Sequence, residues 1–124
     1  MAKKERQPKW LPDVAKGNYT AAESYLALVY PQAQSANLVA ALRNAELVRF
    51  KAKDIFRASQ LSLLGISNSR VEKDRAQIGD GEPLSPLLLV RDAANGKVVV
   101  ADGYHRLCAV YRVDEDAWIP CKIV

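Results

Sequence analysis

The residues best suited to chemistry lie in one short segment near the C-terminus, Asp102–Cys108, which reads Asp-Gly-Tyr-His-Arg-Leu-Cys. An apolar run at 97–101 precedes it and is typical of a strand, and after Gly103 apolar residues recur every three or four positions, as on a helix with one buried face. The first turn of a helix favours anions, because its N–H groups lack partners and the positive end of the dipole lies there. Gly103 allows a close approach to the backbone, and Arg106 can donate two parallel hydrogen bonds to phosphate oxygens. The segment therefore predicts a phosphate-binding corner between a strand and a helix.

Each residue of this corner also has a structural alternative. His105 is the only histidine, so it cannot build a multi-histidine metal site, and it is either a phosphate contact or a hydrogen-bonded structural residue. Arg106 either binds an anion or pairs with Asp102 or Glu115. Asp102 is expected to cap the helix rather than to bind magnesium, and Tyr104 either stacks on a base or packs in the core. We predict no metal site.

Further candidates come from a short segment in the middle of the chain. Lys51 and Lys53 could add positive charge to the same pocket. If the protein is an enzyme, a carboxylate must act as general base, and Asp54 is the nearest candidate. The charged residues at 72–75 are predicted to lie on a solvated helix face.

Positive charge is concentrated at the N-terminus. The net charge is +4, but residues 1–16 hold five of the 18 Lys and Arg residues and two of the 14 acidic residues. The remaining chain is therefore almost neutral, and we predict residues 1–16 to be a flexible basic tail. Any DNA binding is expected to be weak and non-specific and to depend on this tail, through Lys3, Lys4, Arg6, Lys9 and Lys16.

Composition limits the class of protein. A chain of 124 residues is expected to form one globular unit, here 17–124. Cys108 and Cys121 lack metal-ligand spacing and are predicted to be reduced core residues. No apolar run reaches the ~20 residues of a membrane span and no targeting segment is recognisable, so we expect a cytoplasmic protein without a membrane partner.

The first half of the chain predicts mostly helix. Thr20 has capping-box spacing and opens a helix that Pro31 ends. Ser35 is expected to cap a second helix, so that residues 17–46 form a helical hairpin. A short strand at 47–52 and a helical turn capped by Asp54 follow, and then a loop at 60–68.

The second half predicts a small sheet. Ser69 opens a capping box for a polar helix that stops near Gly79 and Gly81. An apolar strand at 86–90 is joined by an Asn95-Gly96 turn to the strand at 97–101. The last strand, 118–124, contains Pro120, which favours an edge or bulge position.

The order of these elements together with the Asp-Gly-Tyr-His-Arg box resembles the ParB/sulfiredoxin superfamily over residues 47–124. The resemblance implies an α+β fold in which a small mixed sheet carries packed helices, here preceded by the helical hairpin. It also implies that Gly103, His105 and Arg106 hold the phosphates of a nucleotide, because ParB proteins bind CTP, sulfiredoxin binds ATP and a free-serine kinase binds ADP at this corner.

Two departures narrow what the resemblance implies. Tyr104 stands where sulfiredoxin has its catalytic cysteine, and a phenol cannot replace that thiol. Partitioning ParB proteins continue into a helix-turn-helix domain, for which a chain ending at Val124 leaves no room.

The sequence thus predicts a nucleotide-binding protein with phosphates held by Asp102, Gly103, Tyr104, His105 and Arg106, and with ATP, ADP or CTP as ligand, with or without Mg²⁺. One alternative is a small phosphotransferase or nucleotide hydrolase, and another is a DNA-associated accessory protein. The oligomeric state is left open and is compatible with a homodimer.

Overall fold

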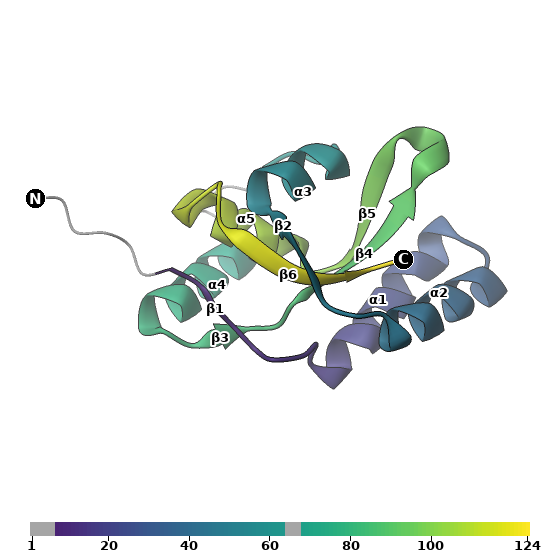
Figure 1. Cartoon of the computed structure of the whole chain (residues 1–124), viewed down its shortest axis with the longest axis horizontal. Helices are drawn as coiled ribbons and strands as arrows, with labels where there is room; N and C mark the ends of the chain where they lie inside the picture. The colour runs from purple at the N-terminus through teal and green to yellow at the C-terminus, as the bar shows by residue number, and fades with distance from the viewer. Residues whose placement is uncertain (1–6, 64–67) are drawn as a thin grey trace, which may run out of the picture.

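The computed structural model in Figure 1 describes residues 7–63 and 68–124. Its centre is a four-stranded sheet in the order β2–β6–β4–β5, in which β4 and β6 are parallel and the other neighbours antiparallel. The predicted α+β fold with a small mixed sheet is confirmed. The strands span Val48–Lys51 (β2), Leu87–Asp92 (β4), Lys97–Asp102 (β5) and Trp118–Ile123 (β6).

Helices pack on both faces of this sheet. One face is covered by α1 and α2, and the other by α3, α4 and α5. The strand β4 is apolar from Leu87 to Val90 because both of its faces are buried: Leu87 and Leu89 contact one core, and Leu88 and Val90 the other. The helices span Lys16–Val29 (α1), Gln32–Asn44 (α2), Ala52–Ser59 (α3), Ser69–Asp80 (α4) and Tyr104–Val113 (α5).

The predicted helical hairpin is confirmed, but both of its helices begin earlier than the capping patterns indicate. The first helix starts four residues before Thr20, and the second starts three residues before Ser35. Ser35 lies buried inside α2, where its hydroxyl donates to the carbonyl oxygen of Gln32 at 2.9 Å. Neither helix start has a side-chain cap, so the two predicted capping roles are wrong.

The predicted polar helix is α4, and its cap is Asn68 rather than Ser69. The Asn68 side-chain oxygen accepts hydrogen bonds from the N–H groups of Arg70 and Val71. The helix ends as predicted at Gly81, which adopts the left-handed conformation with φ of 74°. Of the loop predicted at 60–68, residues 64–67 lie outside the described residues.

The hairpin of β4 and β5 is also confirmed. Its turn is one 3₁₀ turn, Ala93–Asn95, followed by Gly96 with φ of 63°, rather than a two-residue turn. Pro120 does not mark an edge, because β6 lies between β2 and β4. Pairing with β4 starts only at Cys121, so the ladder on that side does not include the residue without an N–H.

The predicted flexible tail is wrong from about residue 9 onwards. Lys9–Trp10 form the short strand β1, which pairs in parallel with β3, Pro83–Leu84. Val14 is buried, and the N–H of Ala15 donates to the hydroxyl of Ser85 at 3.0 Å. The globular unit therefore begins well before residue 17; residues 1–6, with Lys3, Lys4 and Arg6, lie outside the described residues.

Both cysteines are unpaired and buried, as predicted. Burial raises the pKa of the Cys121 thiol to about 12, which keeps it protonated and unreactive at neutral pH. Within the ranges that the structure describes, no helix has the length and apolar character needed to cross a bilayer.

Candidate functional site

The predicted strand-to-helix corner is present. β5 ends at Asp102, α5 begins at Tyr104, and Gly103 between them has φ of +106°. A Cβ atom on Gly103 would lie 2.8 Å from both Arg106 Nη2 and Leu87 Cγ. Glycine is required here for two reasons, the backbone conformation and the close approach of these side chains.

Asp102 does not cap α5, contrary to the prediction. Its carboxylate accepts a hydrogen bond from Arg106 Nη2 at 2.9 Å, and each of the two side chains is only 16% exposed. The same Nη2 lies 3.4 Å from the side-chain oxygen of Asn18 and 3.4 Å from the carbonyl oxygen of Pro86. Asp102 therefore orients Arg106, which ties the corner to α1 and to the start of β4.

Arg106 also contributes to a pocket beside the first turn of α5. Its Nε is buried and has no hydrogen-bond partner among the described residues. The pocket measures about 300 Å³ and lies between α4 and α5. Its lining is mainly polar and comprises Arg70, Lys73, Asp74, Gln77, Asp102, Gly103, His105 and Arg106.

Half of this lining comes from α4, whose charged residues at 72–75 were predicted to lie in solvent. Arg70, Lys73, Asp74 and Gln77 follow the spacing i, i+3, i+4, i+7, which is one face of a helix. The signal was present as a polar stripe next to the buried residues Val71 and Ile78. The prediction missed these polar side chains because local sequence does not show that α4 packs against α5.

Asp74 is the carboxylate of this stripe. It is half-buried, and burial raises the pKa of its carboxyl above the ordinary value. Arg106, His105, Lys73 and Arg70 act in the opposite direction, because each positive charge favours the carboxylate. The prediction that Asp74 lies on a solvated face is wrong.

A second pocket of about 300 Å³ adjoins the first. The two share Arg70, Asp102, Gly103 and His105, so the corner separates them. The second pocket is more apolar, and its distinct lining comprises Ala21, Tyr25, Leu61, Val100, Ala101 and Tyr104.

Tyr104 packs against the core, which is one of its two predicted alternatives, and it also lines this second pocket. Stacking on a base stays a prediction. Its hydroxyl is buried and without a hydrogen-bond partner among the described residues. Burial raises the pKa of Tyr104 to about 12, and the neighbouring Cys108 thiol adds to the shift. Cys108 is fully buried, which makes it unsuitable as a nucleophile.

Three predicted site residues lie away from the corner. Lys53 and Lys51 face Asp116, with Nζ to Oδ1 distances of 2.6 and 4.0 Å. Asp54 is 3.8 Å from Arg57 and lines a different, mainly apolar pocket of about 250 Å³ between α3 and the sheet. The structure does not bring these residues to the phosphate site that the sequence predicted for them.

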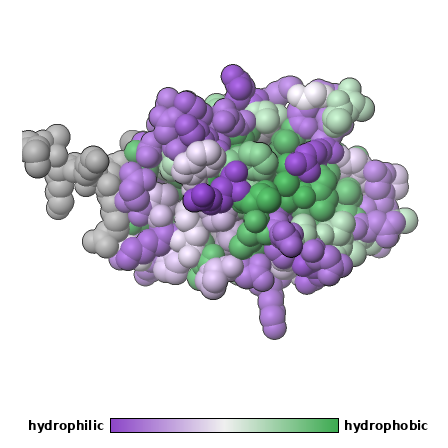
Figure 2. Space-filling model, viewed as in Figure 1, coloured by the Kyte–Doolittle hydropathy of each residue, from purple (hydrophilic) through white to green (hydrophobic). Residues whose placement is uncertain are grey.

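The surface near the α3 pocket is apolar. Figure 2 shows a continuous hydrophobic area where β2 and the end of β6 run in Figure 1. Leu47, Val48 and Phe50 are among the exposed large apolar residues. The α3 pocket shares no lining residue with the two pockets at the corner, so it is a separate feature of the molecule.

Within residues 7–63 and 68–124, no group of three or more His, Cys, Asp and Glu side chains is arranged to hold a metal ion. Comparison with protein-family models, with curated proteins and with solved structures found no match to this chain. The resemblance to the ParB/sulfiredoxin superfamily therefore stays a prediction from the sequence.

Proposed function

We propose that this protein binds a nucleotide, with its phosphates in the polar pocket at the first turn of α5. The observation that carries the proposal is the convergence of Arg70, Lys73, His105 and Arg106 on that pocket from two helices. Basic side chains around a helix N-terminus favour a multiply charged anion, because guanidinium, ammonium and backbone N–H groups all donate to its oxygens.

The pairing of Arg106 with Asp102 supports this role rather than competing with it. An arginine whose position is set by a carboxylate 2.9 Å away loses less conformational entropy when it binds an anion. Asp102 neutralises part of the charge of Arg106, so Arg70 and Lys73 supply the remaining positive charge. Both come from the α4 stripe.

The adjoining apolar pocket has the character that a base and sugar require. Tyr25, Leu61 and Tyr104 offer aromatic and aliphatic surface in the pocket that adjoins the phosphate pocket. Each pocket is about 300 Å³, which is at the lower limit for small-molecule sites, and together they reach the usual range. A nucleotide is therefore a better fit than inorganic phosphate alone.

The first test is calorimetric titration with ATP, ADP and CTP, with and without Mg²⁺. Arg70→Gln and Lys73→Gln should each weaken binding of the preferred nucleotide on the order of tenfold, about 1.4 kcal/mol, because each removes one charge-assisted contact. Thermal stability should change little, since both residues are exposed. Lys97→Gln in the β4–β5 hairpin removes the same charge and is the control. An equal loss in Lys97→Gln, or no binding of any nucleotide, would contradict the proposal.

Asp74 favours a second candidate, a nucleotide-dependent phosphotransferase or hydrolase. It is a half-buried carboxylate with a raised pKa inside the phosphate pocket, which is the environment of a general base. Asp54, the base predicted from sequence, lines another pocket. If nucleotide is hydrolysed, Asp74→Asn should abolish phosphate release and Asp54→Asn should not.

Asp74→Asn also tests the electrostatics of binding. The carboxylate opposes a phosphate, so affinity should rise a few-fold in Asp74→Asn, and the wild-type affinity should fall as pH rises through the raised pKa of Asp74. Because the pKa of Asp74 is raised in the folded state, this carboxyl favours folding at low pH. That contribution to stability is lost as pH rises through the pKa of Asp74 in the folded protein. Nucleotide affinity and urea stability between about pH 4 and 7 measure both effects. Asp80→Asn, at an exposed position of the same helix, should leave both profiles unchanged.

A further inference from the structure

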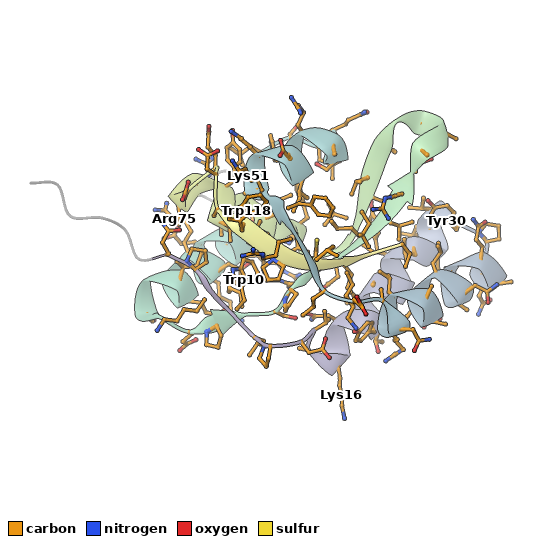
Figure 3. The ribbon with its side chains drawn as sticks, in the orientation of Figure 1. Trp10, Lys16, Tyr30, Lys51, Arg75 and Trp118 are labelled. Carbon is orange, nitrogen blue, oxygen red and sulfur yellow. The ribbon has the colours of Figure 1, made fainter. Side chains whose placement is uncertain are left out.

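A second surface with binding chemistry lies at the opposite end of the sheet from the β4–β5 hairpin. Trp118 is 52% exposed, second only to Leu28 among the large hydrophobic residues that the structure describes. The Arg49 guanidinium lies 5.7 Å and the Lys51 ammonium 5.4 Å from the centre of the indole ring. Figure 3 shows Trp118 with Lys51 beside it, where β2 and β6 meet.

The register of the strands explains this grouping. Lys51 pairs with Trp118 and Arg49 pairs with Pro120, and paired residues of antiparallel strands point to the same face. This is the face of the sheet that α1 and α2 cover. Their hydrophobic core contacts β4, β5 and Val124, but it includes none of the described residues of β2. The indole and Arg49 are therefore left exposed, and Lys51 is half-buried.

The charge of this surface is positive. Asp116 is 2.6 Å from Lys53 and 4.0 Å from Lys51, so it neutralises mainly Lys53. Arg49 is exposed and has no ion pair with a described residue. An isolated exposed tryptophan is ordinary, but an exposed indole on β6 with two cations of the neighbouring strand β2 close to its ring combines a stacking surface with sites for two anions.

We propose that the face formed by Arg49, Lys51 and Trp118 binds single-stranded nucleic acid. A base stacks on the exposed indole, while Arg49 and Lys51, which both come from β2, bind the phosphates on either side of that base. This combination of an aromatic platform and a cationic rim is how single strands are held without sequence readout. A duplex does not fit, because its bases are stacked on one another and not open to the indole. The site is separate from the nucleotide pocket and does not depend on it.

Tryptophan fluorescence provides a direct test, because the chain has only two tryptophans. In the Trp10→Phe protein, Trp118 is the only tryptophan, and titration with a single-stranded oligothymidylate of about ten nucleotides should quench its emission saturably. Trp118→Leu should weaken oligonucleotide binding by about 5- to 150-fold, whereas Trp118→Phe should retain part of the affinity. Because the side chain is exposed, neither variant should alter the melting temperature.

Charge variants separate this site from general electrostatic attraction. Arg49→Gln combined with Lys51→Gln should weaken binding and reduce its dependence on salt by the amount expected for the loss of about two phosphate contacts. Asp116→Asn should strengthen binding. Lys16→Gln combined with Lys97→Gln removes the same charge elsewhere and should have little effect. Deleting residues 1–7 should also leave the quenching intact.

Several outcomes would overturn the proposal. These are no quenching at low salt, tighter binding of duplex than of single strand, equal losses in the two double variants, or loss of binding only when residues 1–7 are deleted. The last result would assign nucleic-acid binding to the N-terminal basic residues. ATP or CTP binding should be unchanged in Trp118→Leu, so failure here leaves the nucleotide proposal standing.

Discussion

Replacing Gly103 by alanine should lower the free energy of unfolding by about 2–4 kcal/mol. Two costs combine at this position. A φ of +106° is unfavourable for any residue with a Cβ, and the new methyl carbon would lie 2.8 Å from Leu87 Cγ, which is in the buried core. Urea denaturation followed by circular dichroism measures the effect. Nucleotide binding should be lost as well, because the methyl group also displaces the Arg106 guanidinium.

Three other glycines serve as controls for this experiment. Gly96 has φ of +63°, and a Cβ atom there would meet nothing within 4 Å, so Gly96→Ala should show the conformational cost alone, about 1 kcal/mol. Gly17 and Gly79 lie in helices with open space around them, and alanine there should be neutral or stabilising. If Gly103→Ala lowered the free energy of unfolding no more than Gly96→Ala does, the side chains at the corner would not be as closely packed around Gly103 as described.

Replacing Arg106 by alanine should have two separate effects. Nucleotide affinity should fall at least tenfold, through the loss of about 1.5–3 kcal/mol from charge-assisted hydrogen bonds. Stability should fall by about 2–4 kcal/mol, because Asp102 is only 16% exposed and would lose the partner of its carboxylate. Calorimetry of nucleotide binding and urea denaturation measure the two effects independently.

A double-mutant cycle separates the structural role of Arg106 from its binding role. Asp102→Ala combined with Arg106→Ala should cost less than the two single changes together, because neither charge is then left without its partner. Asp102→Ala alone should reduce affinity less than Arg106→Ala does, since Asp102 positions the arginine and does not contact phosphate. Unchanged nucleotide affinity in a folded Arg106→Ala protein would show that the arginine serves only the fold.

The corner itself could be predicted because it depends on local sequence. An apolar strand, a glycine and a 3.6-residue apolar period are adjacent in the chain, and each needs only its neighbours to form. The same is true of the hairpin at Asn95-Gly96 and of the helix end at Gly81, where glycine supplies a positive φ.

The other half of the site depended on packing that no local pattern contains. Arg70, Lys73, Asp74 and Gln77 form the same polar stripe whether α4 faces solvent or α5, and only the packing of the two helices makes the stripe a pocket wall. In the same way, Asp102 stands in the sequence where a helix cap is expected, but in the structure its carboxylate pairs with Arg106.

The predictions for Lys51, Lys53 and Asp54 were wrong because local sequence does not show where a strand lies within a sheet. The two lysines were placed near the corner because they lie near the first predicted strand, and Asp54 was the nearest candidate for a general base. Strand order and register instead direct the lysines to Asp116, and Asp54 lines the α3 pocket. Register also leaves Trp118 exposed beside Arg49 and Lys51, a grouping of two segments that are far apart in the chain.

The sequence alone thus determined the class of fold, the buried cysteines and the strand-to-helix corner with its required glycine. These follow from hydrophobic period and backbone conformation, which act between residues close in the chain. Tertiary structure decided which charged side chains share a pocket, where β6 lies in the sheet, and that residues 9–15 belong to the fold. Each of these depends on contacts between distant segments, such as the pairing of Trp10 with Leu84, whose free energy exists only once the chain has folded.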